Sequence, residues 1–424
     1  MQTRRLAWTV VIAAAAACGD GGATDPCEGV SGRCIRFDPG PDVAEAVQEA
    51  FVLAQPGDTF GFGPGQFEFT VGLSLDVDRV TIRGAGMDDT VWSFAGQIAG
   101  AQGLLVTGNE FVMEDIAVED TIGDAIKIEG TRGVTLRRVR AEWTGGPNSD
   151  NGAYGLYPVQ TQDVLIEGCV AIGASDAGIY VGQSRNVIVR DSRAERNVAG
   201  IEIENTVGAD VHDNVATENT GGVLVFALPG LQEPECRRVR VFDNEVFDNN
   251  TPNFAPAGNI VGKVPQGTGI AVLAAHEVEV FGNDVRDNQT VNFGAISYRT
   301  TQLESDDPNY DPFTDSVFVH DNTFVGGGDE PVDELGFLLV QGLVTVMDPP
   351  VVVPDIVFDG DWDPAKLVDG TLPPEYRSCV ARNGDADWVV LDVPNDFAGA
   401  ELNPPALDCE REPLPAVTIP GDAR

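Results

Sequence analysis

The sequence predicts an all-β fold: a right-handed parallel β-helix (a solenoid) with an N-terminal capping helix and an irregular C-terminal tail. Composition is the first observation, because 49 of the 424 residues are Gly and only 7% are aromatic, which favours turn-rich β structure. The second is an internal repeat of short alternating strands. The third is the even spacing of Gly178, Gly200 and Gly222. A repeat of roughly 20–25 residues is typical of solenoids, whose coils stack to bury their apolar faces.

The repeat contains two kinds of strand. The first kind runs into a turn with Asp-Asn or a small substitute, as in VRVFDN (239–244), VEVFGN (278–283) and VFVHDN (317–322). The second kind follows that turn and begins with Gly, as in GIYVGQ (178–183) and GIEIEN (200–205). Like residues of successive coils should stack about 4.8 Å apart. We therefore expect an internal ladder in which side chains satisfy turn backbone groups, formed by Asn214, Asn244, Asn283 and Asn322, with Cys169 and Ser192 in the same column.

The N-terminus is predicted to be a targeting segment. Arg4 and Arg5 precede the apolar run LAWTVVIAAAAA, which is too short to span a bilayer and is typical of a signal peptide over residues 1–17. The run ends in Ala-Ala-Ala-Cys, which resembles a bacterial lipoprotein cleavage box. We expect Cys18 to be lipidated and residues 18–39 to form a tether. The protein would then be held in the cell envelope, at the outer membrane or periplasmic face, and would touch the membrane only through its lipid. Ordinary cleavage, leaving a soluble exported protein, is the alternative.

Residues 40–348 are predicted to form the β-helix. At its start, Val43, Val47 and Phe51 have helical spacing, which predicts an amphipathic helix that caps the first coil. After about residue 345 the repeat fades into a segment rich in Pro, Asp and Gly. We expect residues 349–424 to be a tail packed on the solenoid.

Export favours disulfides, since they persist outside the cytosol. Cys27 and Cys34 are close in sequence, as are Cys379 and Cys409, and we predict these two pairs. Cys169 lies three coils, about 14 Å, from the rung that follows Cys236. A disulfide needs Cα atoms within about 7 Å. Cys169 is therefore predicted to be a buried free thiol, unless the insertion around Cys236 folds back.

The charge restricts the partners. The chain has 67 Asp and Glu against 26 Lys and Arg, for a net charge of −41, which argues against nucleic acid and anionic membrane surfaces as partners. The chain has no Asp-x-Asp-x-Asp-Gly loop and no cluster of Cys and His. We predict no metal site and no cofactor, with Ca²⁺ left open because carboxylates suit it.

Outward-pointing side chains form a column on the second kind of strand. Taking Gly178 as reference, the next residues alternate inward and outward, so that Tyr180 points out. The same column contains Lys127, Tyr157, Tyr180 and Glu202, and Glu129, Val159, Gly182 and Glu204 lie beside it. Aromatic faces stack on sugar rings, and charged groups bind hydroxyls or carboxylates. We expect a ligand site made of Lys127, Tyr157, Tyr180, Glu202 and Glu204, whose outward side chains bury little area. The alternative is a surface that carries these residues by chance.

The stretch YGLYPVQ (154–160) resembles a motif of the pectin-lyase-like superfamily. Alginate (mannuronan) C5-epimerases carry Tyr-Gly-Phe-Asp-Pro-His-Asp at such a position, with the Tyr, Asp and His in catalysis. Tyr154, Gly155 and Pro158 match, whereas Tyr157, Val159 and Gln160 replace the Asp, the His and the final Asp. The resemblance, which covers about residues 40–345, implies an exported bacterial β-helix protein. Because valine cannot transfer a proton, it also implies that the epimerase pair is lost.

Two functions follow. The first is a binding module for a polysaccharide or another exported protein, with insertions 228–236 and 249–267 forming one rim. The alternative is a polysaccharide lyase or epimerase that uses Tyr154, Tyr157 or Tyr180 with Lys127. Like charges repel, so the acidic surface makes free polyuronate a poor ligand, and a neutral or Ca²⁺-bridged glycan is expected.

Overall fold

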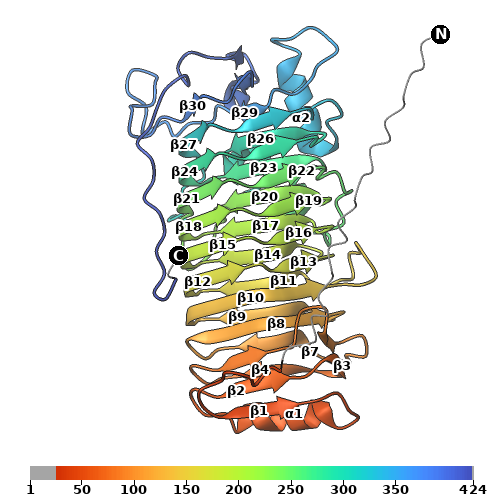
Figure 1. Cartoon of the computed structure of the whole chain (residues 1–424). Helices are drawn as coiled ribbons and strands as arrows, with labels where there is room; N and C mark the ends of the chain where they lie inside the picture. The colour runs from red at the N-terminus through yellow and green to blue at the C-terminus, as the bar shows by residue number, and fades with distance from the viewer. Residues whose placement is uncertain (1–24, 423–424) are drawn as a thin grey trace, which may run out of the picture.

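The computed structural model describes residues 25–422, so the predicted signal peptide (1–17) and Cys18 lie outside the described residues. Parallel strands wind into a tall stack of coils, with the N-terminal strands at one end and residues 349–408 at the other (Figure 1). The prediction of an all-β parallel β-helix is confirmed. Within residues 25–422, no helix is both long enough and apolar enough to cross a membrane.

Each coil contributes strands to three rows. The first row comprises β1 (Cys34–Phe37), β2 (Thr59–Phe62), β5 (Thr81–Arg83), β8 (Phe111–Glu119), β10 (Arg132–Glu142), β12 (Gln162–Glu167), β15 (Arg185–Arg190), β18 (Val207–His212), β21 (Arg237–Phe242), β24 (His276–Phe281), β27 (Asp315–His320) and β30 (Cys379–Ala381). The second comprises β3 (Gly65–Glu68), β6 (Thr90–Ser93), the ends of β8 and β10, β13 (Val170–Ile172), β16 (Arg193–Glu195), β19 (Val215–Thr217), β22 (Glu245–Phe247), β25 (Asp284–Arg286) and β28 (Thr323–Val325). These two rows form one continuous sheet.

The third row is a separate sheet, which carries the candidate site. It comprises β4 (Val71–Leu75), β7 (Ala99–Val106), β9 (Asp124–Glu129), β11 (Tyr154–Val159), β14 (Ala177–Gly182), β17 (Ala199–Glu204), β20 (Gly221–Phe226), β23 (Thr268–Leu273), β26 (Val291–Ile296), β29 (Ile356–Phe358), β31 (Trp388–Val390) and β32 (Glu401–Leu402). All its pairings are parallel except the last, between β31 and β32. Helices are few: α1 (Val43–Val52), α2 (Asp333–Leu343) and the 3₁₀ turns η1 (Ile260–Lys263), η2 (Tyr298–Thr301) and η3 (Val393–Asn395).

The core consists of columns of small aliphatic side chains. Strand register stacks one such column through six coils, and each member is at most 1% exposed: Val164, Val187, Ala209, Val239, Val278 and Val317. Burying one valine contributes roughly 1.5–3 kcal/mol. Stacking in register buries one such side chain in every coil, which stabilises the same conformation in each.

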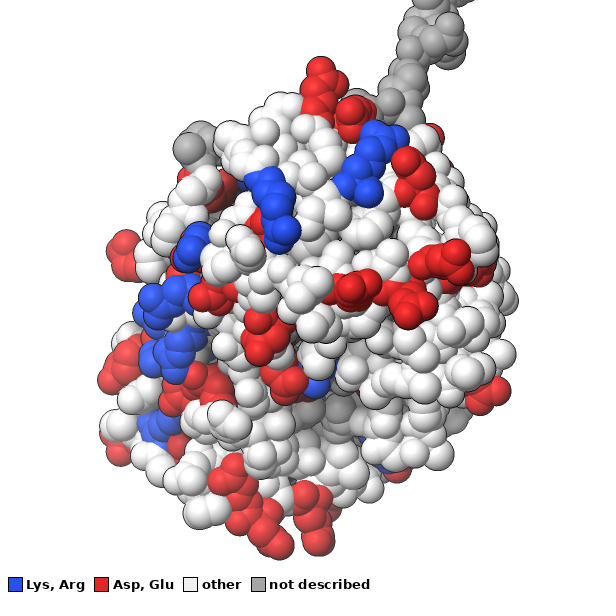
Figure 2. Space-filling view, turned by 90° about the horizontal axis from the view of Figure 1, so that it is seen from below, with Lys and Arg blue, Asp and Glu red and all other residues white. Residues whose placement is uncertain are grey.

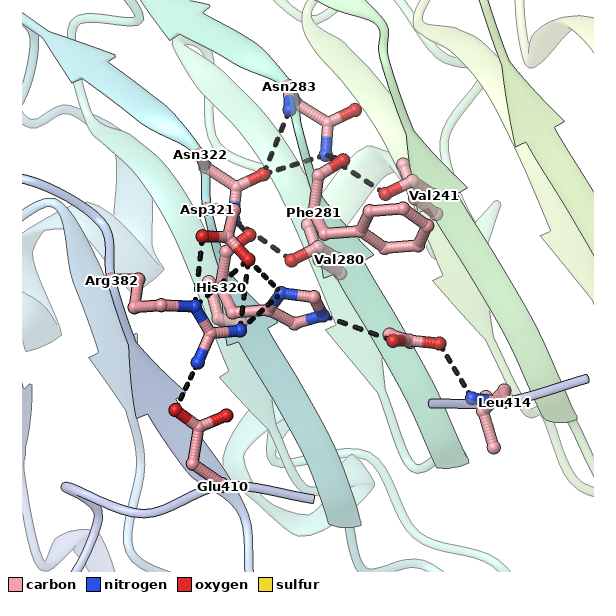
Figure 3. Close-up of polar contacts among 12 residues, drawn as sticks. Val241, Val280, Phe281, Asn283, His320, Asp321, Asn322, Arg382, Glu410 and Leu414 are labelled. Atoms are coloured by element: carbon pink, nitrogen blue, oxygen red, sulfur yellow. Dashed lines mark hydrogen bonds and ion pairs between the residues drawn. The ribbon is translucent and has the colours of Figure 1, made fainter. Parts of the chain in front are cut away.

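The predicted asparagine ladder is present. Asn214, Asn244 and Asn283 each donate their backbone N–H to the side-chain oxygen of the next asparagine, at 3.0, 3.1 and 3.1 Å, and the third acceptor is Asn322. Their amide groups donate to carbonyls of the preceding coil, as Figure 3 shows for Asn283 and Val241. The column continues in both directions, since Asn322 bonds to Asn383, and Cys169 is linked to Asn214 through Ser192.

A second ladder was not predicted. Asn197, Asn219, Asn249 and Asn288 bond in the same way at the turn before each third-row strand. This ladder explains the spaced glycines. A Cβ atom at Gly178 would lie 2.5 Å from the amide nitrogen of Asn197, and one at Gly200 would lie 2.7 Å from that of Asn219. Side chains do not fit there, so glycine recurs with the coil.

The N-terminal cap is the predicted helix. In α1, Val43, Val47 and Phe51 face the core, and the ring of Phe51 lies 4.9 Å from that of Phe60 in the first coils. The expected tether is shorter than predicted, because β1 begins at Cys34 and pairs with β2. The disulfide Cys27–Cys34 fastens this strand to the preceding residues.

The C-terminal boundary at residue 348 is wrong. β29 and β31 extend the third row, and β30 extends the first row, so the solenoid continues into the segment expected to be a tail. The disulfide Cys379–Cys409 is present at the start of the true tail. Cys169 and Cys236 are both buried free thiols.

Residues 409–422 run back along the first row as an extended strap (Figure 1). Glu410 pairs with Arg382, and the backbone N–H of Leu414 donates to Glu279 at 2.8 Å (Figure 3). Further along, the N–H of Val417 donates to Asp210, Ile419 packs on Leu165 and Ile188, and Asp422 pairs with Arg190. The strap therefore ties several coils together.

Candidate ligand-binding site

The strand register places the predicted site residues in two neighbouring columns. Lys127 pairs with Tyr157 on the next coil, and Tyr180, on the coil after that, pairs with Glu202 on the coil that follows it. The pairing of Leu156 with Ile179 sets Tyr157 beside Tyr180. The second column contains Glu129, Val159, Gly182 and Glu204 in that order. The register therefore places these residues in the two expected columns.

Three tyrosines form one aromatic cluster on this face. The ring of Tyr154 lies 4.4 Å from that of Tyr157 and 4.6 Å from that of Tyr180, and the last two rings are 5.0 Å apart. The ammonium of Lys127 lies 5.4 Å from the centre of the Tyr157 ring and 3.2 Å from Glu129. Glycine at position 182 leaves room for the phenol, since a Cβ there would lie 2.0 Å from the oxygen of Tyr180.

The expectation that these side chains bury little area is wrong for three of them. Tyr180, Glu202 and Glu204 are 3%, 1% and 7% exposed. The phenol of Tyr180 donates a hydrogen bond of 2.6 Å to Glu204. Although these residues point away from their own coil, another part of the chain covers them.

The cover is insertion 249–267, which crosses the outward face of the third row. Val264 lies against Gly221 on the coil that follows that of Glu202, since a Cβ atom at Gly221 would lie 3.0 Å from it. At its far end, the amide of Asn259 donates a hydrogen bond of 3.1 Å to Asp176. The insertion forms a roof over this face as well as a rim beside it.

Two acids that the sequence reasoning missed complete the site. Asp124 begins β9, three residues before Lys127, and the register sets it beside Tyr154. Asp176 lies in the turn before β14 and is 5% exposed. Strand alternation could have identified Asp124, but it does not predict where a turn residue such as Asp176 points.

Burial changes the acidity of this cluster. It raises the pKa of Asp124 to about 6. Burial and the neighbouring Glu204 raise the pKa of Asp176 to about 7, and burial raises that of Glu204 to about 7. The pKa of Glu202 is raised well above its usual value by burial, with Asp176 and Glu204 adding to the effect. These carboxyl groups can therefore hold protons close to neutral pH.

Glu202 has an oxygen, Oε2, that is buried without a hydrogen-bond partner. In the described part of the chain, none of Asp176, Glu202 and Glu204 forms an ion pair with Lys or Arg. Among residues 25–422, no three His, Cys, Asp or Glu side chains are placed to hold a metal ion. Protonation of the carboxyl groups therefore removes the negative charge that these buried acids would otherwise carry.

The accessible part of the site is its mouth, formed by Asp124, Lys127, Tyr154 and Tyr157. All four side chains are half-buried. Burial raises the pKa of both phenols, so they remain protonated at neutral pH. The mouth presents an aromatic face, one cation and one titratable carboxyl, which together can stack on a sugar ring, bind its hydroxyls and exchange a proton.

A cavity of about 720 Å³ is lined largely by the insertion. Its walls come from the insertion, from residues 228–229 and from the turns after β26, and Lys263 and Glu334 meet across it at 2.8 Å. Asn259 belongs both to this cavity and to the acid cluster. Movement of the insertion would therefore affect both hollows.

Most basic side chains are engaged elsewhere. Figure 2 shows Asp and Glu over much of the N-terminal end, while Lys and Arg gather mainly along one side. One column of the first row alternates in charge, through Arg83, Glu114, Arg137, Glu167 and Arg190. Each of these arginines pairs with a carboxylate. This column stabilises the stack of coils and leaves little positive charge for a ligand.

The comparisons with known proteins agree with this architecture. A family model described as the right handed beta helix region matches residues 74–229. The chain is a right-handed β-helix. No curated protein matches the sequence significantly.

Two solved structures have a backbone fold similar to that of this chain. The A-module of the mannuronan C-5 epimerase AlgE6 of Azotobacter vinelandii is 18% identical, with 80% of this chain and 89% of that chain covered and a TM-score of 0.53. The DFA-IIIase of Arthrobacter chlorophenolicus A6 is 12% identical, with 76% and 84% covered and a TM-score of 0.50. At these identities the two structures show the parallel β-helix fold alone.

Proposed function

We propose that the protein binds a polysaccharide at the mouth, with a sugar ring stacked on Tyr157 and its hydroxyls held by Lys127 and Asp124. The observation that carries this proposal is the tyrosine cluster itself, a half-exposed aromatic face beside a cation on an otherwise acidic sheet. The similarity to a mannuronan epimerase supports a glycan as the class of ligand. Because acids outnumber the single lysine, a neutral or cation-bridged glycan suits the site better than a free polyuronate.

Binding would be tested with a glycan array, with and without Ca²⁺, followed by calorimetry on the best ligand. Tyr157→Ala should weaken binding at least about fivefold, since stacking on an aromatic ring contributes roughly 1–3 kcal/mol. Tyr376→Ala is the matched control, because Tyr376 is an exposed tyrosine on the C-terminal segment. Equal affinity of Tyr157→Ala and the control would move the ligand to another face.

A lyase or epimerase is the second candidate. The observation that favours it is Asp124, whose pKa of about 6 lets it exchange a proton near neutral pH beside Tyr154 and Tyr157. The loss of a proton-transferring group at Val159 is thus partly offset on a neighbouring strand. Incubation with polyuronates in D₂O would reveal lysis as unsaturated products and epimerisation as deuterium at C5. Neither product at any pH between 5 and 9 would leave binding as the function.

The cellular setting is part of the proposal. Lipidation at Cys18 would hold the solenoid at the cell envelope, where polysaccharides and other exported proteins are the available partners. Mass spectrometry of the mature N-terminus checks it, because an unmodified Cys18 or a start at Gly19 would contradict the anchor.

A further inference from the structure

Insertion 249–267 is fastened by polar contacts at both ends, and in its middle Ala255 and Ile260 pack on the core through partly buried side chains. Near its start, Thr251 and Thr220 are joined by a hydrogen bond of 2.9 Å. Near its end, Lys263 pairs with Glu334 of α2, and the backbone of Gln266 bonds to Asp333. Its tip, residues 255–260, has one hydrogen bond to the site beneath it, from Asn259 to Asp176.

The tip contains a point where the backbone can turn freely. Gly258 has a φ of 100°, a conformation that L side chains rarely adopt, and a Cβ atom there would meet nothing within 4 Å. Ala257 and Gly258 are exposed, whereas Val261 and Val264 further along are buried against the sheet. The tip can therefore lift while the rest of the insertion stays packed.

The groups beneath the tip are acids without a cation. Glu202 and Glu204 come from β17, Asp176 comes from the turn before β14, and the phenols of Tyr154 and Tyr180 lie among them. The thiol of Cys236 lies near Glu204, and Asp124 adds a further carboxyl at the mouth. The only charged residue of the insertion is Lys263, which is engaged with Glu334.

We propose that the tip of this insertion is a lid over the buried half of the glycan site, and that protons on Asp176, Glu202 and Glu204 keep it closed. The closed lid removes these carboxyl groups from water, and it leaves Oε2 of Glu202 without any partner. Carboxylates buried together without a counter-charge are strongly unfavourable, so closure requires that they carry protons. Opening lets water reach them, and they then ionise. This inference rests on the proposed glycan site, since it describes how that site is uncovered.

The direction of the pH dependence follows from the raised pKa values. An exposed Asp or Glu ionises near pH 4, whereas Asp176 and Glu204 do so at about 7 under the closed lid. The closed state is fully favoured below pH 4, and this preference is lost as the pH rises from about 4 to about 7. Over the upper part of that window, from pH 5 to pH 7, each such group should raise the open population at least about tenfold.

Amide hydrogen exchange measured by mass spectrometry tests the lid directly. After correction for the intrinsic rate, exchange in residues 255–260 of the wild type should rise at least about tenfold between pH 5 and pH 7. The double variant Glu202→Gln/Glu204→Gln should show at most about a third of that rise, because it keeps the shape and only Asp176 of the three acids can still ionise. Strands β21 and β24 should exchange alike in both proteins, which shows that the solenoid is intact.

Glu334→Gln is the matched control. It removes the carboxylate that holds Lys263 at the other side of the insertion, so exchange should increase by a similar factor at both pH values. Exchange of the wild-type tip that does not respond to pH would overturn the lid, as would a pH response that the double variant retains in full. The measurement needs no glycan, so its failure would leave the glycan proposal standing, and a failure to bind any glycan would leave the exchange result unchanged.

Discussion

Replacing Asn244 by Leu tests the asparagine ladder most directly. The side-chain oxygen of Asn244 accepts the backbone N–H of Asn214 at 3.0 Å, and its amide group donates to the carbonyl of Val211 at 2.9 Å. Leucine has the same number of side-chain heavy atoms and the same branching, so the substitution removes these bonds without opening a cavity. The N–H of Asn214 then has no acceptor in a site that is 1% exposed.

The expected loss can be worked out from the groups left unpaired. A buried polar group without a partner costs about 1–3 kcal/mol. With the N–H of Asn214 fully orphaned and the Val211 carbonyl deprived of one donor, Asn244→Leu should lower the free energy of unfolding by about 2–5 kcal/mol.

The assay is denaturant unfolding followed by circular dichroism and fluorescence, with Asn309→Leu as the control. Asn309 lies exposed in a loop, so its replacement should change stability by less than about 0.5 kcal/mol. Coincident transitions with the two probes are needed, because solenoids can unfold in parts. A loss for Asn244→Leu no larger than that of Asn309→Leu would refute the view that the ladder stabilises the coils.

Three further predictions concern buried groups. Tyr180→Phe should lower the free energy of unfolding by about 1–3 kcal/mol, because it leaves Glu204 without its phenol donor, whereas Tyr376→Phe in the same denaturant titration should have no effect. Cys169 and Cys236 should react with a thiol reagent only after unfolding, since burial raises the pKa of each thiol to about 12; labelling of the native protein would contradict this. Burial lowers the pKa of His320, but its hydrogen bonds to Glu279 and Asp321 outweigh this and raise it. The protonated imidazole therefore stabilises the fold below about pH 6.5, and this contribution is lost as the pH rises through the raised pKa of His320. The melting temperature of the wild type should fall over that range, whereas the melting temperature of His320→Gln should not show this fall.

The fold was predictable because its determinants are local and repeated. Each coil contains its own alternating strands and its own Asn turn, so one register explains the ladder from Asn214 to Asn322. The second ladder was not predicted, although Asn219, Asn249 and Asn288 each follow an asparagine of the first ladder by five residues. The end of the solenoid was misplaced because β29 to β31 are only three residues each, too short to show alternation.

The site was predictable only in part, for a physical reason. Alternation tells which way a side chain points relative to its own coil, and this placed Lys127, Tyr157 and Tyr180 in one column as expected. It does not tell whether a distant segment covers that side chain. Insertion 249–267 comes from a later coil, and its path over Glu202 depends on tertiary contacts that no local pattern contains.

The solenoid does not need acids at this position. The residues that follow Glu202 in its column, on the next two coils of the third row, are Leu224 and Ala271. Leu224 is fully buried. An apolar residue at position 202 would thus fit the pattern of its neighbours, and replacing buried charged groups by apolar ones is often neutral or stabilising by about 1–4 kcal/mol. A chain selected for stability alone would have leucine where it has glutamate. The cluster of acids and phenols at this point of the sheet is therefore the place where the proposed ligand and proton effects should be sought first.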